Sequence, residues 1–402
     1  MTTVGTDAAL HRRIEANDQF FCAEAQRLAE LCHKMAERFA RGGRLIALGQ
    51  SPAERSDARH VAVEFVHPVI VGKRALPALA LAAEGGPLVD QIGLVIETDD
   101  IAIGFGADDD DGQARAALAL ARERGALTIG FAAGSAEWEF LPPSEDPAIR
   151  QELVETLYHV LWELVHVFFD HRGLLEGRDE RTKHDAGGSS FLYPFLGEAH
   201  DDLAAVTADV RRSILIKAIE ISSLRTQTLE DNRESLNIAA AELRERLDAG
   251  GRLLAIGNGG SATDAMDVVA DFRIPTDPRW PARRAMDLTE DSSILTAIAN
   301  DVGVENIFAR QVIAHGRESD MLIAISTSGN SANVIAVLAE ARRRGLGTIA
   351  MVGYDGGRIS SDALADHVIV TRSEHIPRIQ EAQASAYHVL RELVEDRAGD
   401  PA

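Results

Sequence analysis

The 402-residue sequence contains only two cysteines, Cys22 and Cys32. Two thiols cannot build a multi-disulfide framework, and they are too few for a cysteine-based zinc knuckle. Basic residues are also scarce, since 41 lysines and arginines stand against 63 aspartates and glutamates and the net charge is −22. Because the phosphates of nucleic acids attract basic surfaces, this balance argues against nucleic acid as a partner.

Long apolar runs are missing as well. No stretch approaches the roughly 20 apolar residues that a membrane-spanning helix needs, so we expect no membrane partner. Residues 1–13 lack the apolar core of a signal peptide, and we therefore expect a cytoplasmic protein. A chain of this length can fold as two domains, each with a hydrophobic core of its own.

The most informative stretch is MLIAISTSGNS, at residues 321–331. Residues 321–325 form an apolar run typical of a buried strand, and residues 332–344 resume with helical periodicity. The loop between them is rich in hydroxyl groups and has one glycine, which lets the backbone approach a ligand closely. Since the free N–H groups and the positive dipole end of the next helix point at the same place, the loop is suited to bind an anion. Taken alone, an ordinary serine helix cap is the alternative.

Several phrases of the sequence occur twice. GGRLIALG at residues 42–49 returns as GGRLLAIG at residues 250–257, and QELVETLYHVLWELV at residues 151–165 aligns without a gap with QEAQASAYHVLRELV at residues 380–394. This agreement indicates two tandem copies of one domain. We place the first copy in residues 1–170, a linker in residues 171–200 and the second copy in residues 201–397.

Apolar runs alternate with helical patterns in the second copy. We expect strands at residues 253–256, 321–325, 348–352 and 367–370, and in the first copy at residues 44–49 and 101–104. Residues 18–41, 113–124, 203–230 and 235–247 have helical periodicity. The alternation predicts parallel sheets with helices on both faces and ligands at the carboxyl ends of the strands.

Four ordered motifs of the second copy resemble the sugar isomerase (SIS) domain, and in particular its phosphoheptose isomerase branch. They are GNGGS at residues 257–261, LTAIANDVGVENIFARQ at residues 295–311, STSGNS at residues 326–331 and RIQE at residues 378–381. The resemblance implies an α/β fold, with two tandem SIS-type three-layer α/β/α domains built on parallel, flavodoxin-like sheets. It also implies a homo-oligomer, because sites in this family lie between subunits.

The activity that the resemblance implies is the conversion of sedoheptulose 7-phosphate to a heptose 7-phosphate through an enediol. This reaction needs a base, an acid and groups that hold the phosphate. The residues implied to bind the phosphosugar are Asn258, Gly259, Gly260, Ser261, Asp301, Ser326, Thr327, Ser328 and Ser331.

The family also has a histidine and a glutamate four residues apart on one helix, and a glutamine and a histidine eight apart on the last helix. Many members hold zinc with these groups. In the second copy the last-helix pair is Gln380 and His388, but the other pair is Asp267 and Asp271. By this resemblance we expect His388, Asp271 and Gln380 to be catalytic. All four residues together are one candidate zinc set.

The first copy has His60, Glu64, Gln151 and His159 at these family positions, which makes a second candidate zinc set. In place of the serine loop it has four aspartates at residues 108–111, which would repel a phosphate. The first copy thus keeps the catalytic positions of the family but lacks the phosphate loop, whereas the second copy keeps the loop but differs at two catalytic positions. Two hypotheses follow. Either His60, Glu64 or His159 contributes to a composite catalytic site, or the first copy is a scaffold. Turnover unchanged in His60→Ala and Glu64→Ala would exclude the composite site.

Other functions stay open at this point. The substitutions at Asp267 and Asp271 favour a non-catalytic SIS protein that senses a phosphosugar or binds a protein partner. Sugar-phosphate deacylation or amination is disfavoured, since no N-terminal nucleophile or glutamine amidotransferase segment is present. Residues 257–261 lack the GxGxxG spacing, so we expect no nucleotide cofactor.

Overall fold

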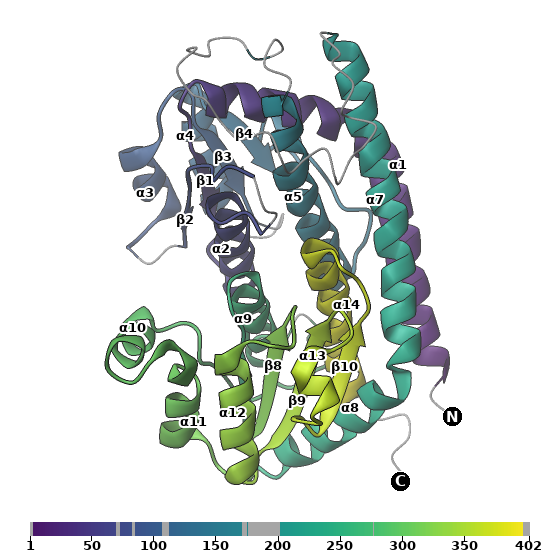
Figure 1. Cartoon of the computed structure of the whole chain (residues 1–402). Helices are drawn as coiled ribbons and strands as arrows, with labels where there is room; N and C mark the ends of the chain where they lie inside the picture. Colours follow the sequence, from purple (N-terminus) through teal and green to yellow (C-terminus); the bar gives the residue numbers. More distant parts are fainter. Residues whose placement is uncertain are drawn as a thin grey trace. The chain divides into compact units, whose positions relative to one another are not determined.

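The computed structural model describes residues 3–69, 73–82, 85–106, 112–170, 175, 202–275 and 277–396. They form two compact units (Figure 1). The N-terminal unit is Glu15–Glu220, and the C-terminal unit combines Met1–Ile14 with Ile221–Ala402. The aspartates predicted at residues 108–111, and the predicted linker apart from Leu175, lie outside the described residues.

The N-terminal unit contains one five-stranded parallel sheet. Its strand order is β2-β1-β3-β4-β5, which is the doubly wound order of flavodoxin-like folds. The elements are α1 (Thr3–Ala40, shared with the other unit), β1 (Leu45–Leu48), α2 (Pro52–Val66), β2 (Ala78–Leu81), α3 (Leu88–Val95), β3 (Ile101–Gly104), α4 (Gln113–Glu123), β4 (Leu127–Gly130), β5 (Trp138–Glu139), α5 (Pro147–Asp170) and α7 (Leu203–Asp231, also shared).

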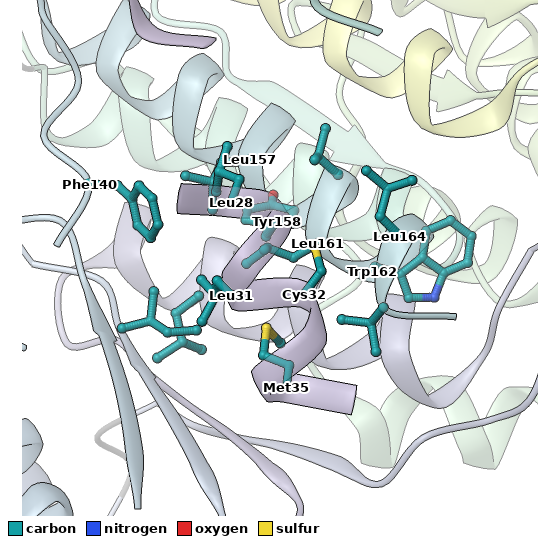
Figure 2. Packing of buried hydrophobic residues seen from close by; sticks show 14 of the residues in the cluster. Leu28, Leu31, Cys32, Met35, Phe140, Leu157, Tyr158, Leu161, Trp162 and Leu164 are labelled. Atoms are coloured by element: carbon teal, nitrogen blue, oxygen red, sulfur yellow. The ribbon is translucent and has the colours of Figure 1, made fainter. Parts of the chain in front are cut away.

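Successive side chains of a strand point to opposite faces of this sheet, so they contribute to two cores, one on each face. In β1, Leu45 and Ala47 pack with α1, α2 and α5, while Ile46 and Leu48 pack with α3 and α4. Figure 2 shows the larger core, where Leu28 and Cys32 of α1 lie near Leu157, Leu161 and other residues of α5. A sheet covered by helices on both faces is a three-layer α/β/α domain.

The C-terminal unit repeats this topology. Its sheet is parallel with the order β7-β6-β8-β9-β10, so its first strand again lies between its second and third. The elements are α8 (Arg233–Asp248), β6 (Leu253–Ile256), α9 (Gly260–Arg273), β7 (Ala285–Asp287), α10 (Ser292–Asp301), η3 (Val304–Asn306), α11 (Ala309–His315), β8 (Met321–Ser326), α12 (Ala332–Arg343), β9 (Gly347–Gly353), α13 (Gly357–Ser361), β10 (His367–Thr371) and α14 (Ile376–Glu395).

Two cores again cover the faces of the sheet. Leu253 and Ile323 pack with α8, α9 and α14, whereas Leu254 and Leu322 pack with α12 and the α10–α11 region. The predicted α/β/α fold class with parallel, flavodoxin-like sheets is thereby confirmed.

A buried aspartate occupies the same place in both units. Asp100 accepts hydrogen bonds from the backbone N–H and guanidinium of Arg44, the residue before β1. Asp320 accepts the same bonds from Arg252, the residue before β6. In both units the arginine thus ties the start of the first strand to the turn that precedes the third.

Four short strands, β2, β4, β5 and β7, have no counterpart among the strands predicted from sequence. β2, β5 and β7 are only two to four residues long. β2, β5 and β7 lie at sheet edges, whereas β4 is a buried strand inside the sheet. Edge strands are half-buried, so they lack the continuous apolar run that marks the central strands. Among the described residues, no helix combines the length and apolar character that a membrane span requires.

Candidate functional site

The two predicted ligand loops lie next to each other in the C-terminal unit. β6 and β8 are adjacent parallel strands, with Ile256 opposite Ala324, so residues 257–261 and 327–331 follow the carboxyl ends of neighbouring strands. β6 has β7 on one side and β8 on the other, which makes this the point where the strand order reverses. In open α/β sheets, ligands bind at such points.

The serine loop is closed by its own hydrogen bonds. The hydroxyl of Ser326 accepts from the N–H of Gly329 at 3.3 Å, and the hydroxyl of Ser328 accepts from the N–H of Asn330 at 3.2 Å. Ser331 begins helix α12, but its side chain makes no capping hydrogen bond there. The half-buried Thr327, Ser328 and Ser331 therefore lie in a loop that leads into a helix N-terminus, a combination that favours a phosphate.

Two glycines are required by close backbone approach. Gly329 has a φ of +62°, and a Cβ there would lie 2.2 Å from the carbonyl oxygen of Gly356. A Cβ at Gly257 would lie 2.0 Å from the carbonyl oxygen of Ser261. Both loops are thus shaped by contacts that only glycine permits.

Asn258 and Asn333 join the two loops. Asn258 Nδ2 donates to Asn333 Oδ1 at 3.0 Å, and Asn333 Nδ2 donates to Asn258 Oδ1 at 2.8 Å. Asn258 is exposed, whereas Asn333 is buried in the first turn of α12. The pair fixes the orientation of the Asn258 amide and leaves one of its N–H groups for a ligand.

A polar cluster lies between α9 and α14. Tyr387 donates its hydroxyl hydrogen to Asp267 Oδ2 at 2.9 Å, and His388 Nε2 lies 3.4 Å from the same oxygen. Burial raises the pKa of Asp271 to about 6, and the charge of Asp267 adds to this effect although His388 opposes it. A carboxylate with a pKa near neutrality is suited to proton transfer.

The remaining residues predicted for the site of this unit lie on α9, α10 and α14 and in the loop before α9. Gln380 is buried on α14, and Gly260 and Ser261 are buried in the first turn of α9, after the exposed Gly259. Asp301 is exposed at the end of α10, where its carboxylate accepts a hydrogen bond from Asn300.

A second polar cluster lies between α2 and α5 of the N-terminal unit. Nε2 of His60 lies 3.3 Å from Nε2 of His159 and 3.9 Å from a carboxylate oxygen of Glu64. Glu155 joins the two histidines, since ligand atoms of these three residues all lie within 4.8 Å of one another. Burial, together with His159, holds the pKa of His60 well below its usual range and so favours the neutral imidazole. Two imidazoles and a carboxylate are able to hold a metal ion.

Gln151, which the sequence also pointed to, contacts a different residue. Its side-chain nitrogen donates to Asp57 Oδ1 at 3.1 Å. Tyr158 contacts both Asp57, at 3.4 Å, and His60 Nδ1, at 3.0 Å.

Sequence reasoning missed Glu155, Tyr158, Tyr387, Asn333 and Asp57. The helical spacing carried a signal for one of them, because Glu155 is four residues from both Gln151 and His159 and so shares their helix face. The two tyrosines stand beside the predicted histidines within the repeated phrase. Nothing in the sequence marked Asn333 as the partner of a residue 75 positions away.

Comparison with known proteins agrees with the geometry of the C-terminal unit. Residues 218–353 match the SIS domain family. The phosphoheptose isomerase of Nitratidesulfovibrio vulgaris is 38% identical over 190 residues, which is 47% of this chain and 90% of that protein. The phosphoheptose isomerase of a Roseiflexus species is 42% identical over 185 residues, 45% of this chain and 91% of that protein.

A solved structure resembles the whole chain in fold. The tagatose-6-phosphate ketose/aldose isomerase from Escherichia coli is 12% identical, with a TM-score of 0.60 over 100% of this chain and 95% of that one. The likeness includes residues 15–217 of the N-terminal unit, which lie outside the SIS match. Through its C-terminal half, the chain belongs to the SIS-domain family of phosphoheptose isomerases.

Proposed function

We propose that the C-terminal unit is a phosphosugar isomerase site that interconverts sedoheptulose 7-phosphate and a heptose 7-phosphate. The observation that carries the proposal is the pairing of the two loops at the carboxyl ends of β6 and β8, with the hydroxyls of Thr327, Ser328 and Ser331 at the start of α12. The identity to phosphoheptose isomerases supports the choice of substrate.

Binding is assigned to the loops. The phosphate would accept hydrogen bonds from the hydroxyls of Ser328 and Ser331 and from N–H groups at the start of α12. Asn258, held by Asn333, would donate to a sugar hydroxyl or carbonyl oxygen. Holding the sugar in this way supplies the orientation that a two-carbon proton transfer requires.

Asp271 is the proposed base. It would remove a proton from C1 of the ketose, the C1–C2 enediol would form as the C2 oxygen gains a proton, and protonation of C2 with loss of the O1 proton would give the aldose. A pKa of about 6 leaves the carboxylate ionised at neutral pH while keeping it basic enough for the step. His388, beside Asp267, is the proposed acid partner.

The test is an assay of the purified full chain with sedoheptulose 7-phosphate, following the aldose product. We expect turnover that is lost in His388→Ala and in Asp271→Asn, and a thermal shift by substrate that is lost in Ser328→Ala but kept in the two catalytic variants. Substrate binding without turnover would overturn the isomerase assignment.

That outcome would support a second candidate, a phosphosugar sensor or adaptor. One observation favours it: the Asp267 oxygen is already engaged by Tyr387 and His388. His388, the proposed acid, is thus paired with a buried carboxylate, and an imidazole paired in this way is less free to act on a substrate.

We also propose that the two units are tandem copies of one domain. The strand order is the same in both, and so is the aspartate that binds the arginine before the first strand. The tyrosine contact is matched as well, since Tyr158 meets His60 where Tyr387 meets the aligned Asp267.

A further inference from the structure

Arg391 of α14 is a buried cation that the function proposed above does not use. It is 0% exposed. Its guanidinium carbon lies 4.6 Å from the centre of the Phe272 ring and 5.0 Å from the centre of the Trp280 ring. A guanidinium at such a distance is attracted to an aromatic ring. Phe272 lies on α9 and Trp280 follows that helix, so these contacts connect α14 with the end of α9.

The end of α9 explains one of the hydrogen bonds of this arginine. In an α-helix the carbonyl oxygen of Asp271 would accept from the N–H of the residue four positions later. That residue is Pro275, which has no N–H. Carbonyl groups in the last turn of a helix need donors from outside it. Arg391 Nε is such a donor, 3.3 Å from the Asp271 oxygen.

The other two guanidinium nitrogens are also engaged. One donates to the carbonyl oxygen of Pro281 at 3.2 Å, and the other pairs with Glu395, one turn further along α14. Each nitrogen thus has its own acceptor, in addition to the two ring contacts. Because the group cannot turn without breaking several of these contacts, Arg391 holds the last turn of α9 in one place.

The carboxylate of Asp271 depends closely on the backbone that carries it. It is one methylene nearer the backbone than the carboxylate of Glu64, the aligned residue of the N-terminal unit. A shorter side chain has fewer torsion angles with which to correct a shift of the helix end. Since a shift of about 1 Å can lower the rate of a reaction by about 100-fold, the anchoring of this turn matters for proton transfer.

The N-terminal unit has a different residue at the position of Arg391. There Pro68 again follows the acidic residue, Glu64, by four positions, but the residue aligned with Arg391 is Trp162. The Nζ atom of Lys73 lies 5.0 Å from the centre of the Trp162 ring. The arginine is therefore specific to the unit that has the phosphosugar loops.

We propose that Arg391 is a positioning residue of the isomerase site. By donating to the carbonyl oxygen of Asp271 and packing against Phe272 and Trp280, it fixes the last turn of α9 and with it the carboxylate that acts as base. This role rests on the proposed function, in which Asp271 is the base. Arg391 acts through Asp271 and not on the substrate, so its loss should lower kcat while the loops maintain KM.

The experiment compares Arg391→Met and Arg391→Lys with the unaltered full chain in the sedoheptulose 7-phosphate assay, at a temperature at which circular dichroism shows each protein to be folded. Arg391→Met should lower kcat by about 100-fold and change KM by no more than about threefold. Arg391→Lys keeps the charge but lacks the planar fork of donors, so kcat should still fall by about 10-fold. Hydrogen exchange in residues 270–274 should be faster in both variants.

Arg283→Met is the matched control. Arg283 also pairs with Glu395, but its side chain has Asp248 rather than α9 as its second partner. This variant removes a cation from the same carboxylate and should keep both kcat and KM.

An unchanged kcat in Arg391→Met, or an equal loss of kcat in Arg283→Met, would overturn the positioning role and leave the proposed function intact. Full turnover in Arg391→Lys would show that a positive charge suffices, and this too would overturn the positioning role. An unaltered chain that does not convert the sugar phosphate would overturn the proposed function and the role of Arg391 together.

Discussion

At the scale of single residues, aligned positions of the two units have different side chains in similar surroundings. Asp267 of the C-terminal unit aligns with His60 of the N-terminal unit. Each of the two residues contacts a tyrosine at the aligned position of the last helix, Tyr387 and Tyr158 respectively. The histidine that follows that tyrosine also faces the same position in both units, at 3.3 Å from His60 and 3.4 Å from Asp267. The same positions therefore bring together two imidazoles in the N-terminal unit, and an imidazole and a carboxylate in the C-terminal unit.

Asp271 gives a prediction about pH. Its pKa is raised to about 6, so the carboxylate gains its proton as the pH falls through 6. If it is the base, kcat/KM should fall tenfold per pH unit below about pH 6, whereas an ordinary aspartate would sustain activity to about pH 4. The measurement is a pH–rate profile with sedoheptulose 7-phosphate. Asp271→Glu should keep an acid limb, and Asp271→Asn should lose about 100-fold or more in rate. A profile that stays flat down to pH 5 would contradict the assignment.

The two cysteines give a prediction about reactivity. Cys22 is exposed, whereas Cys32 is enclosed in the core of α1 and α5, where burial raises the pKa of its thiol (Figure 2). Because the thiolate is the reactive form, a disulfide reagent at pH 8 should titrate one thiol in the folded chain and two in denaturant. Cys22→Ser should abolish the native reaction. Reaction of both thiols at the same rate in the folded chain would show that the core opens readily.

At the scale of elements, the candidate site depends on strand ends that are held close by glycine. β6 and β8 each continue into a loop whose backbone touches another segment, and α12 begins at the second of these loops. The loops have different sequences but are joined through Asn258 and Asn333. Their spacing is therefore set by the sheet and then fixed by side chains.

Gly329 gives the test of this arrangement. Gly329→Ala places a methyl group against the Gly356 carbonyl at a φ of +62°, so the serine loop must move. We expect loss of substrate binding in a thermal-shift assay. Gly250→Ala is the matched control, because Gly250 also has a positive φ, +90°, but has open space around its Cβ position. That variant should cost only about 1 kcal/mol of stability and keep binding. Equal binding by the two variants would refute the close contact.

The asparagine pair gives a second test. Asn333→Ala should weaken substrate binding although Asn333 is buried behind Asn258, because the exposed amide loses its anchor. The two side chains share one interaction. The loss of binding free energy in the double variant Asn258→Ala/Asn333→Ala should therefore be smaller than the sum of the losses in the two single variants, with a coupling energy of about 1 kcal/mol. Additive losses in binding titrations would mean that the two side chains act independently.

At the scale of the whole molecule, each unit has its own sheet and its own pair of cores. Each also has its own buried aspartate directly before the third strand of its sheet, Asp100 before β3 and Asp320 before β8, and each is at most 1% exposed. Each of these carboxylates also accepts from a backbone N–H of the turn before it, that of Glu97 or Arg317. Stability is therefore built separately in the two units.

This separation predicts local effects of mutation. Asp100→Asn should lose hydrogen bonds to Arg44 and destabilise the N-terminal unit by about 2–3 kcal/mol, and Asp320→Asn should do the same in the C-terminal unit. Hydrogen exchange followed by mass spectrometry would locate each effect. Faster exchange in β1, β3 and β4 is expected only for the first variant, and in β6, β8 and β9 only for the second. Equal acceleration in both units by either variant would show that they unfold as one.

The fold class and the position of the serine loop after a buried strand could be predicted from local sequence pattern. Continuous apolar runs such as residues 321–325 are characteristic of central strands, and STSGNS follows such a run, so the carboxyl end of β8 was predictable from local pattern. The repeated phrases predicted two similar domains for the same reason, since core positions constrain residue type along the chain.

Which side chains contact one another depends on the tertiary structure. Asn258 lies next to Asn333, Glu155 reaches His60, and Gln151 turns to Asp57, across separations of 75 to 95 residues. Helical spacing gives the face on which a side chain lies, but not which of several residues on that face reaches a partner on another helix. That choice depends on the packing of α2 against α5 and of α9 against α14, which no local pattern encodes.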